Sequence, residues 1–258
     1  MNRMGLICVL AIAVVTGLLF GLYPELDLRV ASIFHAVETP DHYGFALRYY
    51  PSLVPARDFG LWIPALLVAP AASALLIKLI LPWRKLLMPG QAVIFLIATI
   101  ILAPGIMANV VLKEHWGRSR PVHVTQFGGN EHFVPWWDRR GDCPTNCSFV
   151  SGEVAGAFWT LAPAALAPPQ WRVLAYVAAL ALGTGTAALR IMFGAHFPSD
   201  VTFAGVFTYL IIWVVNGFIY RWPRTRLSDD DVDKSLSRLT LPAYNFVAEL
   251  FGRKPKSY

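Results

Sequence analysis

The residues best suited to chemistry lie in three polar clusters, each next to a long apolar segment. Residues 113–121 (KEHWGRSRP) follow one apolar segment, residues 148–153 (SFVSGE) begin another, and residues 190–200 (RIMFGAHFPSD) link two more. Charged residues make up only 15% of the chain, against about 25% in soluble domains, so their placement is informative. The clusters contain Lys113, Arg118, Arg120, Ser151, Gly152, Glu153, Arg190, His196 and Asp200.

The cations of these clusters suit a phosphate group. An arginine guanidinium can bind two phosphate oxygens at once, and a lysine ammonium adds a mobile point charge. Backbone amides at a helix start also bind anions, and Ser151 and Gly152 stand where an apolar segment begins. A carboxylate ligand would seldom need three cations, so the residue types indicate a phosphate site.

His196 and Asp200 are four residues apart at an expected helix start, with Pro198 well placed in the first turn. The carboxylate of Asp200 could accept a hydrogen bond from one ring nitrogen and so orient the other. An oriented neutral imidazole is a nucleophile or a base. This chemistry needs no metal and no cofactor.

The composition indicates a membrane protein that positions these clusters with helices. Hydrophobic residues make up 56% of the 258 residues, and the mean hydropathy is +0.50. We expect an all-α, polytopic bundle of six transmembrane helices. The expected spans cover residues 4–23, 59–80, 91–112, 150–167, 172–190 and 198–222.

Span parity places all three clusters on one side of the membrane and both termini on the other. With the termini inside, thirteen of the 22 Lys and Arg residues lie inside and nine outside, which favours cytoplasmic termini. The net charge of +6 is spread over span ends and the carboxyl tail, so nucleic-acid binding is not expected. Residues 1–222 are expected to form the membrane domain, and residues 223–258 a cytosolic amphipathic tail.

The connecting segments carry further expectations. Residues 24–58 are predicted to be an extramembrane loop along the bilayer. Ser228 is predicted to cap a helix, followed by a pair of amphipathic helices broken at Pro242 that rest on the membrane or on a partner. Cys143 and Cys147 either form a disulfide or remain two free thiols, and their spacing lacks a second ligand pair for zinc.

Other polar side chains near the clusters have simpler interpretations. Arg118 is expected to contact lipid headgroups; the alternative is that it contacts the substrate. Three histidines of the same loop are interpreted as solvated side chains and not as ligands: His115, His123 and His132.

The clusters resemble a known family, the type 2 phosphatidic acid phosphatases (PAP2 superfamily), in its bacterial membrane lipid phosphatase branch. The family pattern reads Lys-x6-Arg-Pro, then Pro-Ser-Gly-His, then Ser-Arg-x5-His-x3-Asp. The matching residues are Lys113, Arg120 and Pro121 for the first element and Arg190, His196 and Asp200 for the third. The resemblance covers about residues 91–222, with Leu189 in place of the third element's serine.

The resemblance implies a phosphohistidine mechanism. His196 would attack phosphorus, Asp200 would hold its ring, and water would then release phosphate from His196. The transferring phosphoryl oxygens would be bound by Lys113, Arg120, Arg190 and the amides near Ser151 and Gly152.

The second element departs from the family pattern, because Val150 replaces its proline and Glu153 its histidine. The resemblance implies that this histidine protonates the leaving group in the family. Glu153 could be a surrogate acid, a carboxylate that tunes substrate choice, or the mark of a weakened enzyme. The acid role requires a proton on Glu153 near neutral pH, which three nearby cations oppose.

The expected function is hydrolysis of a membrane lipid phosphate at the outer face of a bacterial inner membrane. Lipid A, a polyprenyl diphosphate, phosphatidylglycerol phosphate and phosphatidic acid all fit. One alternative is a lipid phosphotransferase that uses the same histidine, and another is a non-catalytic lipid-binding or transport protein. The expected partners are the lipid substrate and the bilayer, with no obligatory protein partner.

Overall fold

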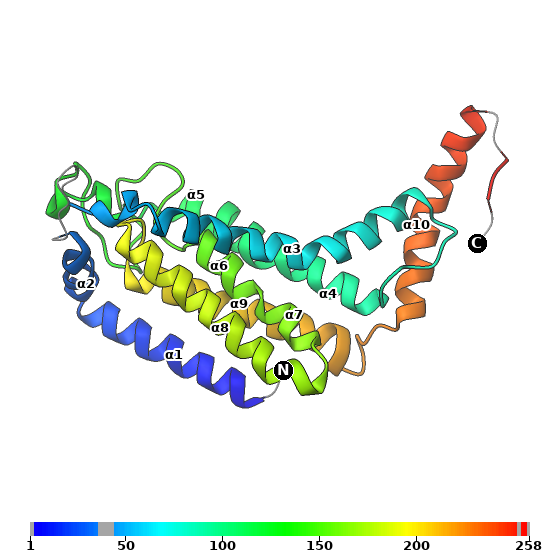
Figure 1. The fold of residues 1–258 in the computed structure, drawn as a ribbon, viewed down its shortest axis with the longest axis horizontal. Coiled ribbons are helices and arrows are strands. Elements are labelled where there is room, and N and C mark those ends of the chain that lie inside the picture. Colours follow the sequence, from blue (N-terminus) through cyan, green and yellow to red (C-terminus); the bar gives the residue numbers. More distant parts are fainter. Residues whose placement is uncertain (1–2, 36–43, 252–253, 257–258) are drawn as a thin grey trace.

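The computed structural model describes residues 3–35, 44–251 and 254–256, and helices dominate them. Figure 1 shows the long helices side by side along the longest axis, with the last helix crossing one end of the bundle. In the described residues the only β pairing is a single bridge between Val124 and Glu131. The prediction of an all-α helical bundle is confirmed.

Within the described residues, five helical segments are long and apolar enough to cross a membrane. They comprise α1 (Arg3–Leu22), α3 (Leu53–Ile80), the continuous helix Gly90–His115, α8 (Pro169–Met192), and α9 (Pro198–Asn216) with its π-helical extension η5 (Gly217–Arg221). The Gly90–His115 helix consists of α4 (Gly90–Ile100), the π-helix η2 (Ile101–Leu112) and α5 (Lys113–His115).

The expected fourth span, residues 150–167, consists of two short helices, α6 (Gly152–Trp159) and α7 (Leu161–Leu166). In Figure 1 they lie in line and lead away from the end that holds α2. Trp159, Leu161 and Ala162 are buried, so protein and not lipid surrounds this segment. Such a segment need not match the thickness of the bilayer. A sixth crossing therefore stays a prediction.

The prediction of an extramembrane loop over residues 24–58 is wrong in two places. It contains the helix α2 (Glu25–His35) and the 3-10 turn η1 (Ala46–Tyr49), and α3 already begins at Leu53. Pro55 does not prevent this, because a proline is tolerated in the first turn of a helix. Residues 36–43 of the expected loop lie outside the described residues.

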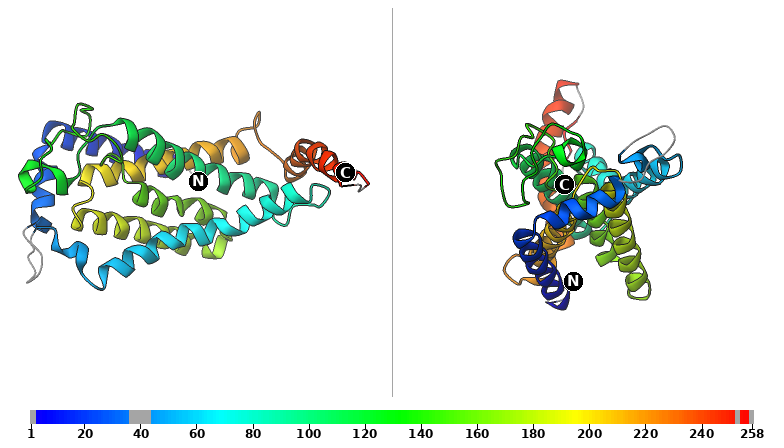
Figure 2. Two further views of the ribbon diagram at one scale, coloured as in Figure 1. Left: turned by 90° about the horizontal axis from the view of Figure 1, so that it is seen from above. Right: turned by 90° about the vertical axis from the view of Figure 1, so that its left-hand side faces the viewer.

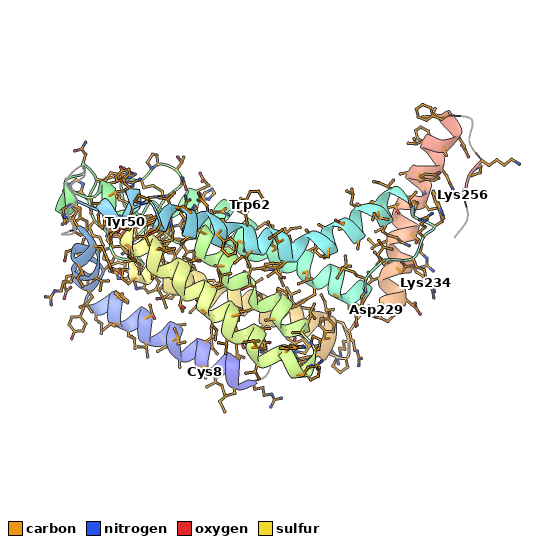
Figure 3. The ribbon with its side chains drawn as sticks, in the orientation of Figure 1. Cys8, Tyr50, Trp62, Asp229, Lys234 and Lys256 are labelled. Carbon is orange, nitrogen blue, oxygen red and sulfur yellow. A yellow bond between two sulfur atoms is a disulfide. The ribbon has the colours of Figure 1, made fainter. Side chains whose placement is uncertain are left out.

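The described part of the tail contains one helix, α10 (Asp229–Leu250), where a pair broken at Pro242 was expected. Ser228 caps it as predicted, with its hydroxyl accepting from the Asp231 amide at 3.1 Å. Asp233 pairs with the buried Lys78 of α3 at 2.9 Å, which fixes α10 across the bundle end (Figure 2). Large apolar side chains beyond this contact are exposed, and the labelled Asp229 and Lys234 show where α10 begins (Figure 3).

Candidate active site

The three polar clusters meet at the end of the bundle opposite α10. The loop after α5, the start of α6, the end of α8 and the start of α9 all converge there, beside α2 (Figure 1). A cavity of about 560 Å³ opens at this end and is lined by four arginines. These are Arg48, Arg57, Arg120 and Arg190.

His196 lies behind the cavity, in the turn between α8 and α9, and is 1% exposed. Its Nδ1 lies 2.7 Å from the Ser148 carbonyl oxygen. A carbonyl can only accept, so Nδ1 carries the proton and Nε2 has the lone pair. Burial lowers the pKa of His196 well below its ordinary value, and the charges of Arg190, Arg120 and Lys113 lower it further. The ring is therefore neutral at neutral pH.

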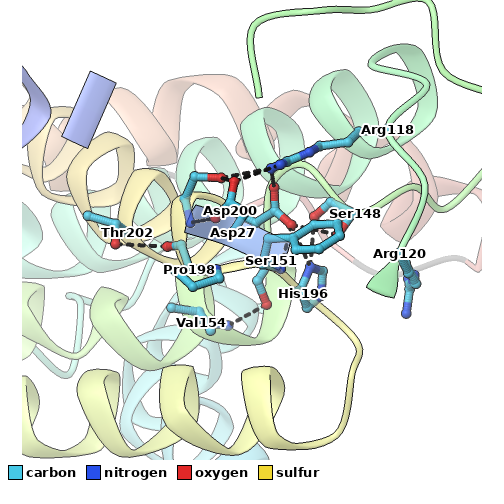
Figure 4. Close-up of polar contacts among 12 residues, drawn as sticks. Asp27, Arg118, Arg120, Ser148, Ser151, Val154, His196, Pro198, Asp200 and Thr202 are labelled. Atoms are coloured by element: carbon cyan, nitrogen blue, oxygen red, sulfur yellow. Dashed lines mark hydrogen bonds and ion pairs between the residues drawn. The ribbon is translucent and has the colours of Figure 1, made fainter. Parts of the chain in front are cut away.

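Asp200 does not accept a hydrogen bond from the His196 ring as expected, because its Oδ2 lies 4.0 Å from Nδ1, beyond hydrogen-bond reach. Instead, Oδ2 accepts from the Ser148 hydroxyl at 2.5 Å and from the Phe197 amide at 2.8 Å. Ser148 thus connects the two residues, since its carbonyl holds the histidine and its hydroxyl holds the aspartate (Figure 4). Sequence spacing alone did not reveal this intermediary.

Arg118 is fully buried, which contradicts its expected place among lipid headgroups. Its Nη1 donates to Asp200 Oδ1 at 2.5 Å, and its Nη2 donates to Asp27 Oδ2 at 2.7 Å (Figure 4). Asp27, from α2, also accepts from the Ser199 amide at 3.0 Å. One guanidinium therefore joins α2, the long loop and α9 behind His196.

The cations expected to bind phosphate lie around this histidine. Arg120 is held by Asn146, whose backbone and side-chain oxygens each accept from Nη2 at 2.8 Å. A disulfide between Cys143 and Cys147 closes the turn that presents Asn146. Arg190 is largely buried, and its Nε has no hydrogen-bond partner among the described residues, so it is available to an anion. Lys113, the first residue of α5, interacts electrostatically with both arginines.

Ser151 and Gly152 form the start of α6, as expected. The Ser151 hydroxyl accepts from the Val154 amide at 3.4 Å and caps the helix. A Cβ at Gly152 would come within 2.2 Å of the Asn109 side chain, so only glycine allows this close approach to η2. The helix start therefore packs tightly beside the cationic cluster.

Glu153 points its carboxylate at two arginines. Arg57 of α3 donates to it through Nε at 2.9 Å and Nη2 at 2.6 Å, and Arg190 Nη1 lies 3.3 Å away. Sequence reasoning missed Arg57 because it placed this residue in an extramembrane loop. Both guanidinium groups stabilise the ionised carboxylate.

Among the described residues, His, Cys, Asp and Glu side chains do not gather in groups of three or more that could hold a metal ion. The four arginines that line the cavity instead make it suited to an anion. Two arginines and a lysine surround a neutral, oriented imidazole, which is an arrangement able to hold a phosphoryl group while a nitrogen attacks it.

The sequence profile of the PAP2 superfamily matches residues 92–226. The chain belongs to this superfamily. As a PAP2 protein with apolar helices, it is an integral-membrane phosphatase. The matched region contains all the motif residues, whereas Asp27 and Arg57, which complete the site, precede it.

Curated relatives extend the likeness beyond the profile. The chain is 33% identical over 224 residues to a lipid A 4′-phosphatase of Francisella tularensis subsp. novicida, covering 86% of this chain and 98% of the relative. It is 43% identical over 106 residues to a lipid A 4′-phosphatase of Rhizobium etli, 41% of each chain. A lipid A 1-phosphatase of Rhizobium etli is 33% identical over 153 residues, 54% of this chain and 60% of the relative. No solved structure matches.

Replacing Arg118 with Met is expected to destabilise this PAP2 protein by about 3–5 kcal/mol, because two buried carboxylates lose their shared cation. Arg118→Lys should destabilise the protein less, since an ammonium keeps the positive charge but lacks the planar fork with which the guanidinium donates to both carboxylates. Thermal or denaturant unfolding in detergent measures both. Arg140→Met is the control, because Arg140 is an exposed residue of the same loop. Equal stability of the Arg118→Met and Arg140→Met variants would contradict the account.

Proposed function

We propose that this membrane phosphatase removes the 4′-phosphate of lipid A. The observation that carries the proposal is the likeness to the Francisella lipid A 4′-phosphatase, which runs through nearly the whole length of both chains. The cavity lined by four arginines supports it, since a lipid with a strongly anionic headgroup needs such a surface. The 1-phosphate of lipid A is the second candidate, because lipid A 1-phosphatases are also among the relatives.

We propose that His196 is the nucleophile. Nε2 of the neutral ring would attack phosphorus, while Arg120, Arg190, Lys113 and the amides after Ser151 neutralise the phosphoryl oxygens. Water would then attack the phosphohistidine and release inorganic phosphate. The hydrogen bond from Nδ1 to Ser148 supports this assignment, because it presents Nε2 in the reactive form before the substrate arrives.

We propose that Asp200 acts on His196 indirectly. Its carboxylate fixes the Ser148 hydroxyl, and the Ser148 carbonyl in turn fixes the ring. Arg118 and Asp27 hold the carboxylate in place, so these two are positioning residues.

We propose that Glu153 is a positioning carboxylate as well. Its contacts with Arg57 and Arg190 favour this role among the three that the sequence leaves open. A carboxylate that neutralises part of the arginine cluster also prevents the cations from repelling one another before phosphate binds. The same contacts oppose a role as proton donor, because they stabilise the ionised form.

The substrate proposal is tested by incubating purified protein with lipid A in detergent and locating the lost phosphate by mass spectrometric fragmentation of the two sugars. We expect loss of the 4′-phosphate with release of inorganic phosphate, and no turnover by the His196→Ala variant. Polyprenyl diphosphate, phosphatidylglycerol phosphate and phosphatidic acid are compared at the same concentration. Faster turnover of any of these would overturn the substrate assignment, and transfer to a second lipid would indicate a phosphotransferase.

We further propose that the protein lies in a bacterial inner membrane, with the site on the periplasmic side and the termini in the cytoplasm. The Cys143–Cys147 disulfide in the site-side loops supports this orientation, since disulfides persist in oxidising compartments. The excess of Lys and Arg at the opposite end supports it too.

The orientation predicts that a reporter enzyme active only in the periplasm is inactive when fused to the carboxyl terminus. The same reporter inserted in the loop between Pro135 and Asp142 should be active. Activity of the carboxyl-terminal fusion would reverse the assignment.

A further inference from the structure

Cleavage of a sugar phosphate requires a proton for the leaving oxygen. An alkoxide of a sugar is a poor leaving group, so a general acid typically accelerates such a step by about 10²–10⁴-fold. Glu153 is badly suited to this task, because Arg57 and Arg190 both hold its carboxylate in the ionised form. The donor must therefore be another group that faces the cavity.

His123 is the one histidine among the described residues that line this cavity. It ends the 3-10 turn η3 (Pro121–His123), directly after Arg120 and Pro121. The neighbouring Val122 amide donates to the Gly194 carbonyl at 3.0 Å, two residues before His196. This bond fixes the turn that carries His123 against the segment that carries the nucleophile.

A carboxylate lies against one edge of the His123 ring. Glu131 Oε1 is 3.8 Å from Nδ1, and the two residues are joined through the backbone, where the Glu131 amide donates to the His123 carbonyl at 2.9 Å. Glu131 also lines the cavity, and its Oε2 is buried without a hydrogen-bond partner among the described residues. At 3.8 Å this is an electrostatic contact beyond hydrogen-bond reach, and it lies on the Nδ1 side of the ring, so it does not involve Nε2.

The other loop histidines are placed differently. His115 bonds the Val111 carbonyl through Nδ1 at 3.0 Å, and His132 pairs with Asp142 at 2.8 Å. Neither lines the cavity. His123 therefore differs from them because it lines the cavity.

We propose that His123 is the general acid of the reaction, an inference that rests on the proposed function. The bond from His196 Nε2 to phosphorus forms as the bond from phosphorus to the sugar oxygen breaks, and the proton on His123 Nε2 moves to that oxygen. In the second step, His123 takes a proton from the attacking water. The oxygen of that water bonds to phosphorus, and the bond to His196 breaks. Each cycle returns both histidines to their starting forms.

The test compares two substrates with the full-length protein in detergent. Lipid A has a leaving group that needs a proton, whereas a long-chain nitrophenyl phosphate has one that departs unprotonated. We expect His123→Ala to lower lipid A turnover by about a hundredfold or more and to leave nitrophenyl phosphate turnover nearly unchanged. Added imidazole should restore lipid A turnover to this variant. Equal loss on both substrates, no loss on either, or failure of imidazole to rescue would overturn the proposal.

Three control variants separate the possible causes. His132→Ala should retain both activities, because this histidine of the same loop lies outside the cavity. Glu153→Gln should lower both activities alike, since it loosens Arg190, and a loss confined to lipid A would instead identify Glu153 as the acid. His196→Ala should abolish both. If His196→Ala retained turnover, the proposed function would fail independently of His123.

A His123→Gln variant and its unfolding temperature check that the fold is intact.

Discussion

The interaction on which the site depends is the contact of one buried guanidinium with two buried carboxylates. Arg118 lies between Asp27 of α2 and Asp200 of α9, and none of the three side chains is exposed to solvent. Three buried charges cost much free energy unless each is paired and hydrogen-bonded, so their positions are tightly restricted. The Ser148 hydroxyl and the Ser199 side chain complete the bonds.

This buried group determines how the reactive end of the protein is assembled. Asp200 can satisfy Arg118 only where its other oxygen meets Ser148, and Ser148 then orients the His196 ring. On the opposite side of His196, the cations face an open cavity. His196 thus lies between the buried, fully paired charges of Arg118, Asp27 and Asp200 and the cations that line the cavity. Burial and the nearby cations both keep the ring uncharged.

Much of the site could be predicted because its motif residues occur in short, regularly spaced clusters. Span counting alone predicts that the clusters lie at one end of the bundle. In the structure the charges of Lys113, Arg120 and Arg190 act on the buried His196, so these residues do lie near one another. The partners Asp27 and Arg57 could not be predicted. They pair with residues 91 and 96 positions away, and one sequence contains no signal for such contacts.

In the fold, too, features that depend on neighbouring residues were predicted better than features that depend on distant contacts. Hydropathy located the long apolar helices, and the serine before three aspartates located the start of α10. Hydropathy alone did not distinguish the buried helices α6 and α7 from a lipid-facing span, since apolar residues serve both environments. Pro242 did not break α10, and tertiary contacts hold the helix on both sides of it: the Ser237 hydroxyl donates to the Pro82 carbonyl, and the Tyr244 ring packs against Trp83.

The central claim is that His196 carries the phosphoryl group between lipid and water. A single-turnover experiment tests it directly: excess protein is mixed with lipid A labelled in its 4′-phosphate, denatured within milliseconds and digested. The account predicts transient label on the peptide that contains His196, with its decay matching the appearance of free phosphate. Release of phosphate without any labelled peptide, or label that persists in the His196→Ala variant, would contradict it.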